Sequence, residues 1–162
     1  MSELNPNHIE SLLGLINKSP FFRHMSIKVT ELGVGFATVM TEIDTNHMNP
    51  FGAIHGGVYA SAIDTAAYWS AYCDLPEDVG LVTIDLKVDF LAPFSEKKLI
   101  INGNRIKSGK TLYLAEAEMT DENGRILAHG TSKLMVTPGM QTIDDVINYI
   151  SADKLPSKFL RS

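Results

Sequence analysis

The longest apolar run of the chain follows a stretch rich in glycine, and it predicts a buried central helix. The stretch spans Asn49 to Gly57, where Pro and Gly interrupt regular structure, and the apolar run continues from Val58 to Tyr72. Wound as a helix, the run is apolar on nearly every face, which is typical of a helix inside a core. Asp64 is the exception. A lone carboxylate two turns into such a helix must be paired with another group, be protonated, or serve a functional role.

The segments before this run predict a short helix followed by two strands. Residues 8–18 place four apolar side chains on one helical stripe, Asn7 with Glu10 resembles a capping box, and Pro20 is expected to end the helix. The stripe consists of Ile9, Leu12, Leu13 and Ile16. Residues 27–32 and 36–43 read as strands, and the glycines between them predict a hairpin.

The segments after the run predict about four more strands. Residues 82–90 show the clearest alternation of apolar and polar positions, which predicts a strand with one buried face. Turn signals separate the strands that follow, so we expect a meander. These strands are expected at 99–107, 112–120 and 126–136, with a terminal helix at 142–150 and a loose tail after it.

The order of elements predicts an α+β fold, in which an antiparallel sheet wraps one hydrophobic helix. We expect a single domain over residues 1–162, with a core at about 20–137, an N-terminal helix and a C-terminal extension. One helix cannot cover both faces of such a sheet. The other face or an edge is therefore expected to meet a second subunit.

Composition narrows the functional classes. The 162 residues are 44% hydrophobic and 20% charged, as expected for one globular domain, and the net charge of −5 argues against a nucleic-acid partner. Neither a membrane span nor a signal peptide is visible, so the predicted location is cytoplasmic. The single Cys73 excludes an internal disulfide and a multi-cysteine metal site, and the scattered histidines lack metal-ligand spacing.

Two features of the central helix suggest chemistry. The backbone N–H groups of Gly56 and Gly57 lie at its expected N-terminus, where they can bind an anion or polarise a carbonyl oxygen. Alternatively, the glycines only permit close packing. Asp64 lies seven residues beyond Gly57, roughly 10 Å along a helix. If both groups act on one substrate, Asp64 most simply comes from a second copy; otherwise it is a buried structural acid.

Other polar residues are candidates with alternative structural roles. His55 is either a base or a residue that holds the loop. Asn49 either donates its side-chain N–H to the substrate carbonyl or is a turn residue. Thr83 either helps to hold a water molecule or is an ordinary strand residue. Several basic residues of the late strands either grip phosphates or form a solvated face. They are Arg105, Lys107, Lys110, Arg125 and Lys133.

The combined pattern resembles the hotdog-fold acyl-CoA thioesterases, in the branch of the phenylacetate-pathway enzymes and thioesterase superfamily member 2. The motif Asn-x-x-Gly-x-x-His-Gly-Gly starts at Asn49, and Asp64 follows the second Gly by seven residues. The resemblance continues through residues 84–93, 109–111 and 121–128.

This resemblance implies a long helix wrapped by a curved sheet, dimers paired into tetramers, and a site at the dimer interface. The Gly56 amide and Asn49 would polarise the thioester carbonyl. Asp64 of the facing subunit would act as general base or nucleophile, with Thr83 positioning the water. The implied catalytic residues are Asp64, Gly56, Asn49, His55 and Thr83. Substrate and coenzyme A contacts are expected at residues 90–95 and 107–111, including Gly57, Phe90, Pro93, Lys107, Ser108, Gly109, Lys110 and Lys133.

The expected function is hydrolysis of an acyl-CoA thioester without metal or other cofactor. Three alternatives stay open: a hydratase or dehydratase using His55 and Asp64, an acyl-CoA binder without catalysis, and a purely structural dimer. The acyl group is undetermined. Several aromatic residues either form core or suggest an aromatic or medium-chain acyl group. They are Tyr68, Trp69 and Phe90 together with Phe21 and Phe22, which with Met25 either pack under the fold or roof an acyl pocket.

Overall fold

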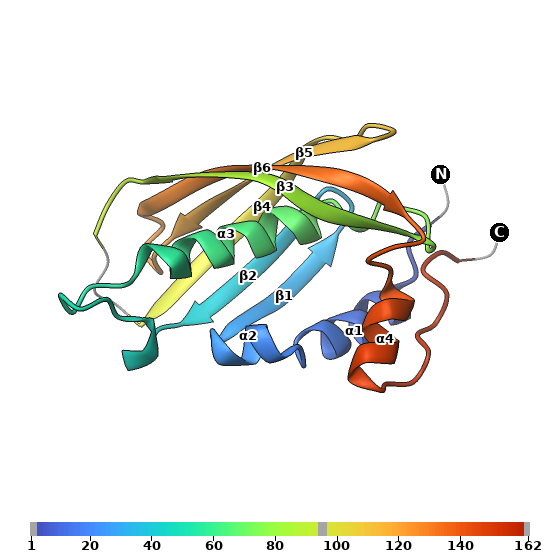
Figure 1. Cartoon of the computed structure of the whole chain (residues 1–162), viewed down its shortest axis with the longest axis horizontal. Helices are drawn as coiled ribbons and strands as arrows, with labels where there is room; N and C mark the ends of the chain where they lie inside the picture. Colours follow the sequence, from blue (N-terminus) through green and yellow to red (C-terminus); the bar gives the residue numbers. More distant parts are fainter. Residues whose placement is uncertain (1–2, 94–96, 161–162) are drawn as a thin grey trace.

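The computed structural model describes residues 3–93 and 97–160, which form a curved antiparallel sheet around a central helix (Figure 1). The strands are β1 (Ile27–Gly33), β2 (Phe36–Glu42), β3 (Val79–Phe90), β4 (Lys98–Lys107), β5 (Leu112–Thr120) and β6 (Ile126–Pro138). The helices are α1 (Pro6–Ile16), α2 (Pro20–His24), α3 (Gly56–Ser70) and α4 (Ile143–Ile150), with a short 3-10 turn at Thr45–His47. Among the described residues, no helix is both long and apolar enough to cross a membrane.

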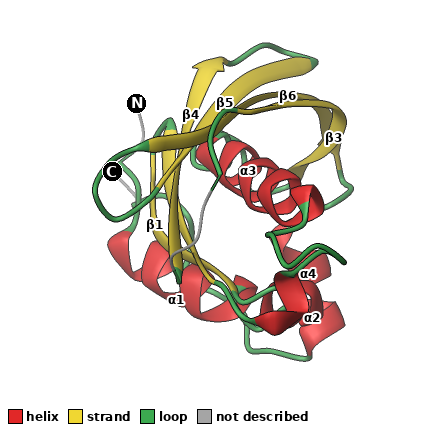
Figure 2. Cartoon of the chain, turned by 90° about the vertical axis from the view of Figure 1, so that its left-hand side faces the viewer, coloured by secondary structure: helices red, strands yellow, loops and turns green. Residues whose placement is uncertain are grey.

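The predicted buried helix is α3, and the sheet closes tightly on it. Ala62, Ile63 and Ala66 have no exposed surface. Glycines of the sheet permit the close approach: a Cβ on Gly130 would lie 2.6 Å from Ile63 Cγ2, and one on Gly103 would clash with the Ala66 carbonyl. Figure 2 shows the sheet curving over α3, while α1, α2 and α4 gather on the side that the sheet leaves uncovered. The α+β prediction of a sheet wrapped on one helix is confirmed.

The strands after α3 do not form a simple meander, and this part of the prediction is wrong. The sheet order is β1-β2-β4-β5-β6-β3, so β3 pairs with β6 at the far edge instead of with β4, its successor in sequence. Three consecutive pairs, β1–β2, β4–β5 and β5–β6, are antiparallel neighbours. Strand alternation records which face is buried but carries no information about the neighbouring strand.

The alternation along β3 predicts its strand correctly but overstates its buried face. Ile84 is 53% exposed and Phe90 is 60% exposed. The pairing with β6 shifts register between Thr83 and Asp85, which places Ile84 at an irregularity of the ladder. Such a bulge interrupts the two-residue period. β3 therefore presents apolar side chains on an outer edge of the sheet.

The N-terminal helix is present, but its predicted boundaries are wrong. Its N-cap is Asn5, whose side chain accepts from the Asn7 backbone N–H at 3.1 Å, and Pro6 occupies the first turn. The helix ends at Ile16, and Pro20 begins α2 instead of ending α1. Both prolines lie at the starts of helices, where their missing N–H groups have no intrahelical partner to lose.

The C-terminal tail is not loose, contrary to expectation. Lys158 is fully buried, and its ammonium donates to the carbonyl oxygens of Tyr72 and Leu75 at 2.6 Å each. The Asn5 backbone N–H donates to the Lys158 carbonyl at 2.8 Å, and Leu4 bridges to Phe159. The two ends of the chain are thereby tied together beside the C-terminal end of α3.

Candidate active site

Asp64 projects from the middle of α3 and meets Thr83 of β3. The Thr83 hydroxyl donates to Asp64 Oδ1 at 3.0 Å, across 19 positions of sequence. Burial raises the pKa of Asp64 above its ordinary value, and the Thr83 hydrogen bond partly opposes this shift. A carboxyl group with a raised pKa is a stronger base once it ionises.

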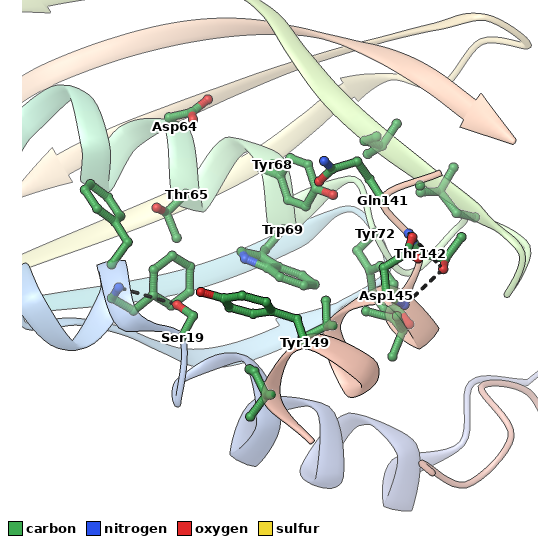
Figure 3. A pocket seen from close by; sticks show the side chains of 18 of the residues that line it. Ser19, Asp64, Thr65, Tyr68, Trp69, Tyr72, Gln141, Thr142, Asp145 and Tyr149 are labelled. Atoms are coloured by element: carbon green, nitrogen blue, oxygen red, sulfur yellow. Dashed lines mark hydrogen bonds between the residues drawn. The ribbon is translucent and has the colours of Figure 1, made fainter. Parts of the chain in front are cut away.

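A cavity of about 710 Å³ opens beside Asp64 (Figure 3). One face of α3 lines it, at the helical spacing of three and four residues. This face consists of Ser61, Asp64, Thr65, Tyr68 and Trp69, and Tyr72 of the following turn continues it. The volume lies within the usual range for small-molecule sites, and the lining combines aromatic surface with a few polar groups. Asp64 thus borders a cavity suited to an apolar ligand.

The opposite wall of the cavity comes from α2 and α4. Phe21 and Phe22 line it, while Met25 packs against the core. The α4 residues were missed by sequence reasoning, although their apolar spacing was visible. They include Ile143, Val146, Tyr149 and Ile150. In Figure 3, Tyr149 lies across from Thr65 and Trp69.

His55 is the N-cap of α3. Its Nδ1 accepts a hydrogen bond from the Gly57 backbone N–H at 2.8 Å, so this nitrogen carries no proton. The arrangement favours the loop-holding role for His55 and occupies the Gly57 amide. Among the described residues, Gly56 N–H has no recorded backbone or side-chain acceptor, and the residue is partly exposed. Gly56 therefore supplies the amide best placed to meet a ligand.

Asn49 organises the loop before α3. Its Oδ1 accepts from the backbone N–H groups of Phe51 at 2.9 Å and Ala53 at 3.1 Å. Gly52, with φ of 78°, takes the left-handed conformation that this turn requires. These bonds use the oxygen of the Asn49 amide, and its Nδ2 is the group that can donate to a carbonyl.

A second hollow, of about 430 Å³, lies at the N-terminal end of α3. It brings together Gly56, Phe90 and Pro93, three of the predicted site residues, with Tyr59. The rings of Tyr59 and Phe90 meet edge to face, with centroids 5.8 Å apart. Residues 94–95, the rest of the predicted contact segment, lie outside the described residues.

The predicted basic contacts lie elsewhere in the chain. The turn at 107–110 is exposed except for Gly109, which is partly buried. The Ser108 hydroxyl oxygen accepts a hydrogen bond from Arg105, and Arg105 also forms an ion pair with Asp74, just beyond α3. This places the turn towards the C-terminal end of α3. Lys133 forms an ion pair with Asp85 at 2.5 Å. The residues before and after Lys133 in β6 are buried and face α3, so Lys133 lies on the outer face of the sheet.

One chain does not assemble all the predicted groups around a single carbonyl. Gly56 and Asp64 are eight residues apart on α3, or about 12 Å along its axis. The turn at 107–110 and Lys133 are separate from both groups. Asp64 and Thr83 are in contact, whereas Gly56 shares its hollow with Phe90 and Pro93.

Neither a reactive thiol nor a cluster of metal ligands is found among the described residues. Burial raises the pKa of the Cys73 thiol to about 11, which keeps it protonated and poorly nucleophilic at neutral pH. Within residues 3–93 and 97–160, no three His, Cys, Asp or Glu side chains gather as a metal site would require.

Comparison with known proteins identifies relatives of this chain. The family model described as "Thioesterase superfamily" matches residues 51–128. The mouse protein "Acyl-coenzyme A thioesterase 13" is 25% identical over 134 residues, covering 80% of this chain and 94% of that protein. A putative esterase of Saccharolobus solfataricus is 30% identical over 105 residues, covering 65% of this chain and 74% of that protein.

Solved structures show the same fold. A thioesterase of Haemophilus influenzae superimposes with a TM-score of 0.77 at 20% identity, covering 86% of this chain and 97% of that one. A putative esterase of Mycobacterium tuberculosis gives 0.69 at 24% identity, covering 74% and 98%. The chain belongs to the thioesterase superfamily of hotdog-fold thioester hydrolases.

Proposed function

We propose that the protein hydrolyses acyl-CoA thioesters, with the Asp64 carboxylate as general base. The observation that carries this proposal is the position of Asp64 beside a largely apolar cavity. Burial there raises the pKa of Asp64, and the Thr83 hydroxyl donates a hydrogen bond to its carboxylate. The mouse relative is named as an acyl-coenzyme A thioesterase, which supports coenzyme A as the carrier.

The reaction divides the work between the middle of α3, which carries Asp64, and the N-terminus of α3, which carries Gly56. Asp64 removes a proton from water while the water oxygen attacks the thioester carbonyl carbon. The negative charge that develops on the carbonyl oxygen is stabilised by the Gly56 N–H at the positive end of the helix, with Asn49 Nδ2 as a second donor. The C–S bond then breaks, and the thiol leaves with the proton that Asp64 received. These groups supply a base and an oxyanion site, so we expect no metal or organic cofactor.

The Asp64 and Gly56 that act on one substrate must come from different copies of the chain. Gly56 and Asp64 of one chain are about 12 Å apart, whereas general-base catalysis needs contacts near 3 Å. We therefore propose a dimer in which Asp64 of one subunit faces Gly56 of its partner, with two such dimers paired into a tetramer. Hydrogen-bonding groups and apolar side chains along the outer edge of β3 support an edge-to-edge contact.

The first test is release of free coenzyme A across a panel of acyl-CoAs. We expect Asp64→Asn to lower kcat by about 10²-fold or more, the scale of removing a general base. The variant should fold at least as stably as wild type, because burial disfavours the charged carboxylate that it removes. Glu116→Gln, on β5, is a matched control and should keep wild-type turnover.

Other outcomes lead to the alternatives. Wild-type turnover in Asp64→Asn would contradict the mechanism. Tight acyl-CoA binding without thiol release would favour a non-catalytic binder. A change in the acyl group without thiol release would favour a hydratase or dehydratase.

A further inference from the structure

The cavity beside Asp64 has a wall that lies outside the segment matched by the thioesterase family model. That segment covers residues 51–128, whereas α2 spans Pro20–His24 and α4 spans Ile143–Ile150. These two short helices face the aromatic side of α3 across the cavity (Figure 3). The shared segment supplies Asp64, and the flanking segments supply much of the surface opposite it.

The apolar face of α4 is turned towards this space. Ile143, Val146 and Ile150 recur at helical spacing and line the cavity together with Tyr149, which is 75% exposed. The cavity lies between this face and Trp69 of α3, so both of its walls present apolar surface. An apolar ligand between them would remove this surface from water, which is favourable.

The C-terminal extension is anchored at both ends, so α4 is a fixed wall. Just before α4, the Gly139 backbone N–H donates to the Asp78 carbonyl at 2.8 Å. Beyond α4, the Pro156 carbonyl meets His8 Nδ1 at 2.7 Å, and the buried Lys158 ammonium holds the end of α3. Anchored walls give a cavity a defined shape, which selection between ligands requires.

The charges around the cavity restrict the ligand further. Among the described residues that line it, the charged side chains are Asp64 and Asp145, and both are acidic. An acyl group that carries a free carboxylate would meet like charge in the cavity without a basic partner. The lining therefore fits a neutral, apolar acyl group.

We propose that α4 forms the specificity wall for the acyl group, and that the protein prefers neutral medium-chain or aromatic acyl thioesters over short or carboxylated ones. This inference rests on the proposed function, because it assigns the acyl end of the same substrate. The thioester carbonyl lies by Asp64, and the acyl body extends between α3 and α4.

The test fills the cavity from α4. Val146→Trp places a large ring on the cavity-lining face, and Asn148→Trp places the same ring at an exposed position of the same helix as a control. We expect Val146→Trp to lower the ratio of kcat/KM for octanoyl-CoA over acetyl-CoA at least 10-fold, since a pocket contact of this kind is worth about 10- to 200-fold. Asn148→Trp should leave the ratio at its wild-type value, and wild type should discriminate against succinyl-CoA.

A second variant guards against simple loss of folding. Tyr149→Ala removes an exposed side chain from the wall and should shift the preference from octanoyl-CoA towards dodecanoyl-CoA. An unchanged chain-length profile in both Val146→Trp and Tyr149→Ala would overturn the inference while leaving thioester hydrolysis in place.

The inference and the proposed function fail in different ways. If wild type hydrolyses no acyl-CoA, the proposed function is wrong. Binding measured by calorimetry then tests whether α4 contacts the acyl group. If octanoyl-CoA binds more tightly than free coenzyme A and Val146→Trp abolishes this difference, α4 contacts the acyl group of a bound but unhydrolysed acyl-CoA. Equal binding of octanoyl-CoA and coenzyme A would overturn the wall as well.

Discussion

Asp64 is held between two opposing influences at the scale of a single residue. Its burial disfavours the charged form and raises the pKa, whereas the hydroxyl of Thr83 stabilises the carboxylate at 3.0 Å. The balance keeps the group ionisable while making it more basic than an exposed aspartate. The proposed catalytic role therefore depends on β3 as much as on α3.

Thr83→Val tests this balance through the pH dependence of hydrolysis. In wild type we expect kcat/KM to rise with pH as Asp64 ionises, with an apparent pKa above the ordinary value of 3.8. Valine keeps the shape but removes the hydrogen bond that stabilises the carboxylate, so the acidic limb should move to higher pH. A pH–rate profile of both proteins measures the shift; an unmoved or lowered apparent pKa would count against the Thr83 contact.

Single residues were predicted well where their chemistry is local. Asp64 is visible as a carboxylate in an apolar helix, and Gly56 as an amide at that helix's start. The partner of His55 was not specified, since a ring that caps the helix and a ring that acts as a base have the same neighbours in sequence. In the structure, His55 Nδ1 accepts a hydrogen bond from the Gly57 N–H, which is the capping arrangement.

The C-terminal end of α3 shows how one element is completed by another. Carbonyl groups at a helix end have no intrahelical partner, and the Lys158 ammonium satisfies those of Tyr72 and Leu75, in the turn that follows α3. The same ammonium lies 3.7 Å from the centroid of the Tyr72 ring. Burial lowers the pKa of Lys158 to about 8, so the group is still mostly charged at neutral pH.

Lys158→Met should release the C-terminal extension from α3. Methionine fills similar space but leaves the Leu75 carbonyl without its donor, while the Tyr72 carbonyl keeps only the Leu75 backbone N–H. A buried unsatisfied group costs about 1–3 kcal/mol. We expect the free energy of unfolding to fall by about 2 kcal/mol or more in urea titrations, and chymotrypsin to cut the tail faster. Lys154→Met, at an exposed position of the same tail, is the control. Equal stability of the two variants would contradict the anchoring role.

Elements with strong periodic patterns were predicted closely. The strand at 112–120 matches β5, and the buried run from Val58 matches α3 within two residues at each end. Helix starts were less predictable, because Asn5 and Asn7 are equally good capping residues and Pro6 decides between them. The tail carries no periodic pattern at all, so its anchoring by Lys158 was not foreseen.

At the scale of the whole molecule, β3 is an outer edge of the sheet with apolar side chains. Ile84 and Phe90 are more than half exposed there, as is Leu91 just beyond the strand. Exposed strand edges of this kind pair readily with another chain. An edge contact would also explain how the separated Gly56 and Asp64 of different copies meet.

Ile84→Lys tests this assembly and its link to catalysis. A charge on the proposed contact edge should shift the protein towards monomer in analytical ultracentrifugation and lower kcat/KM in parallel, because a monomer lacks a complete site. Ile106→Lys changes an equally exposed isoleucine, 51% against 53%, at the end of β4 and should do neither. A fully active monomeric Ile84→Lys variant would contradict the shared site.

The sequence by itself determined the elements and the chemistry that each carries: an apolar helix with one acid, glycines at its start, and strands with one buried side. These features follow from spacing over a few residues, which is local. Only the tertiary structure decided that β3 lies beside β6, that Thr83 meets Asp64, and that α4 walls the cavity. Such contacts join residues 19 or more positions apart, and they depend on how apolar faces pack in three dimensions, which no local period encodes.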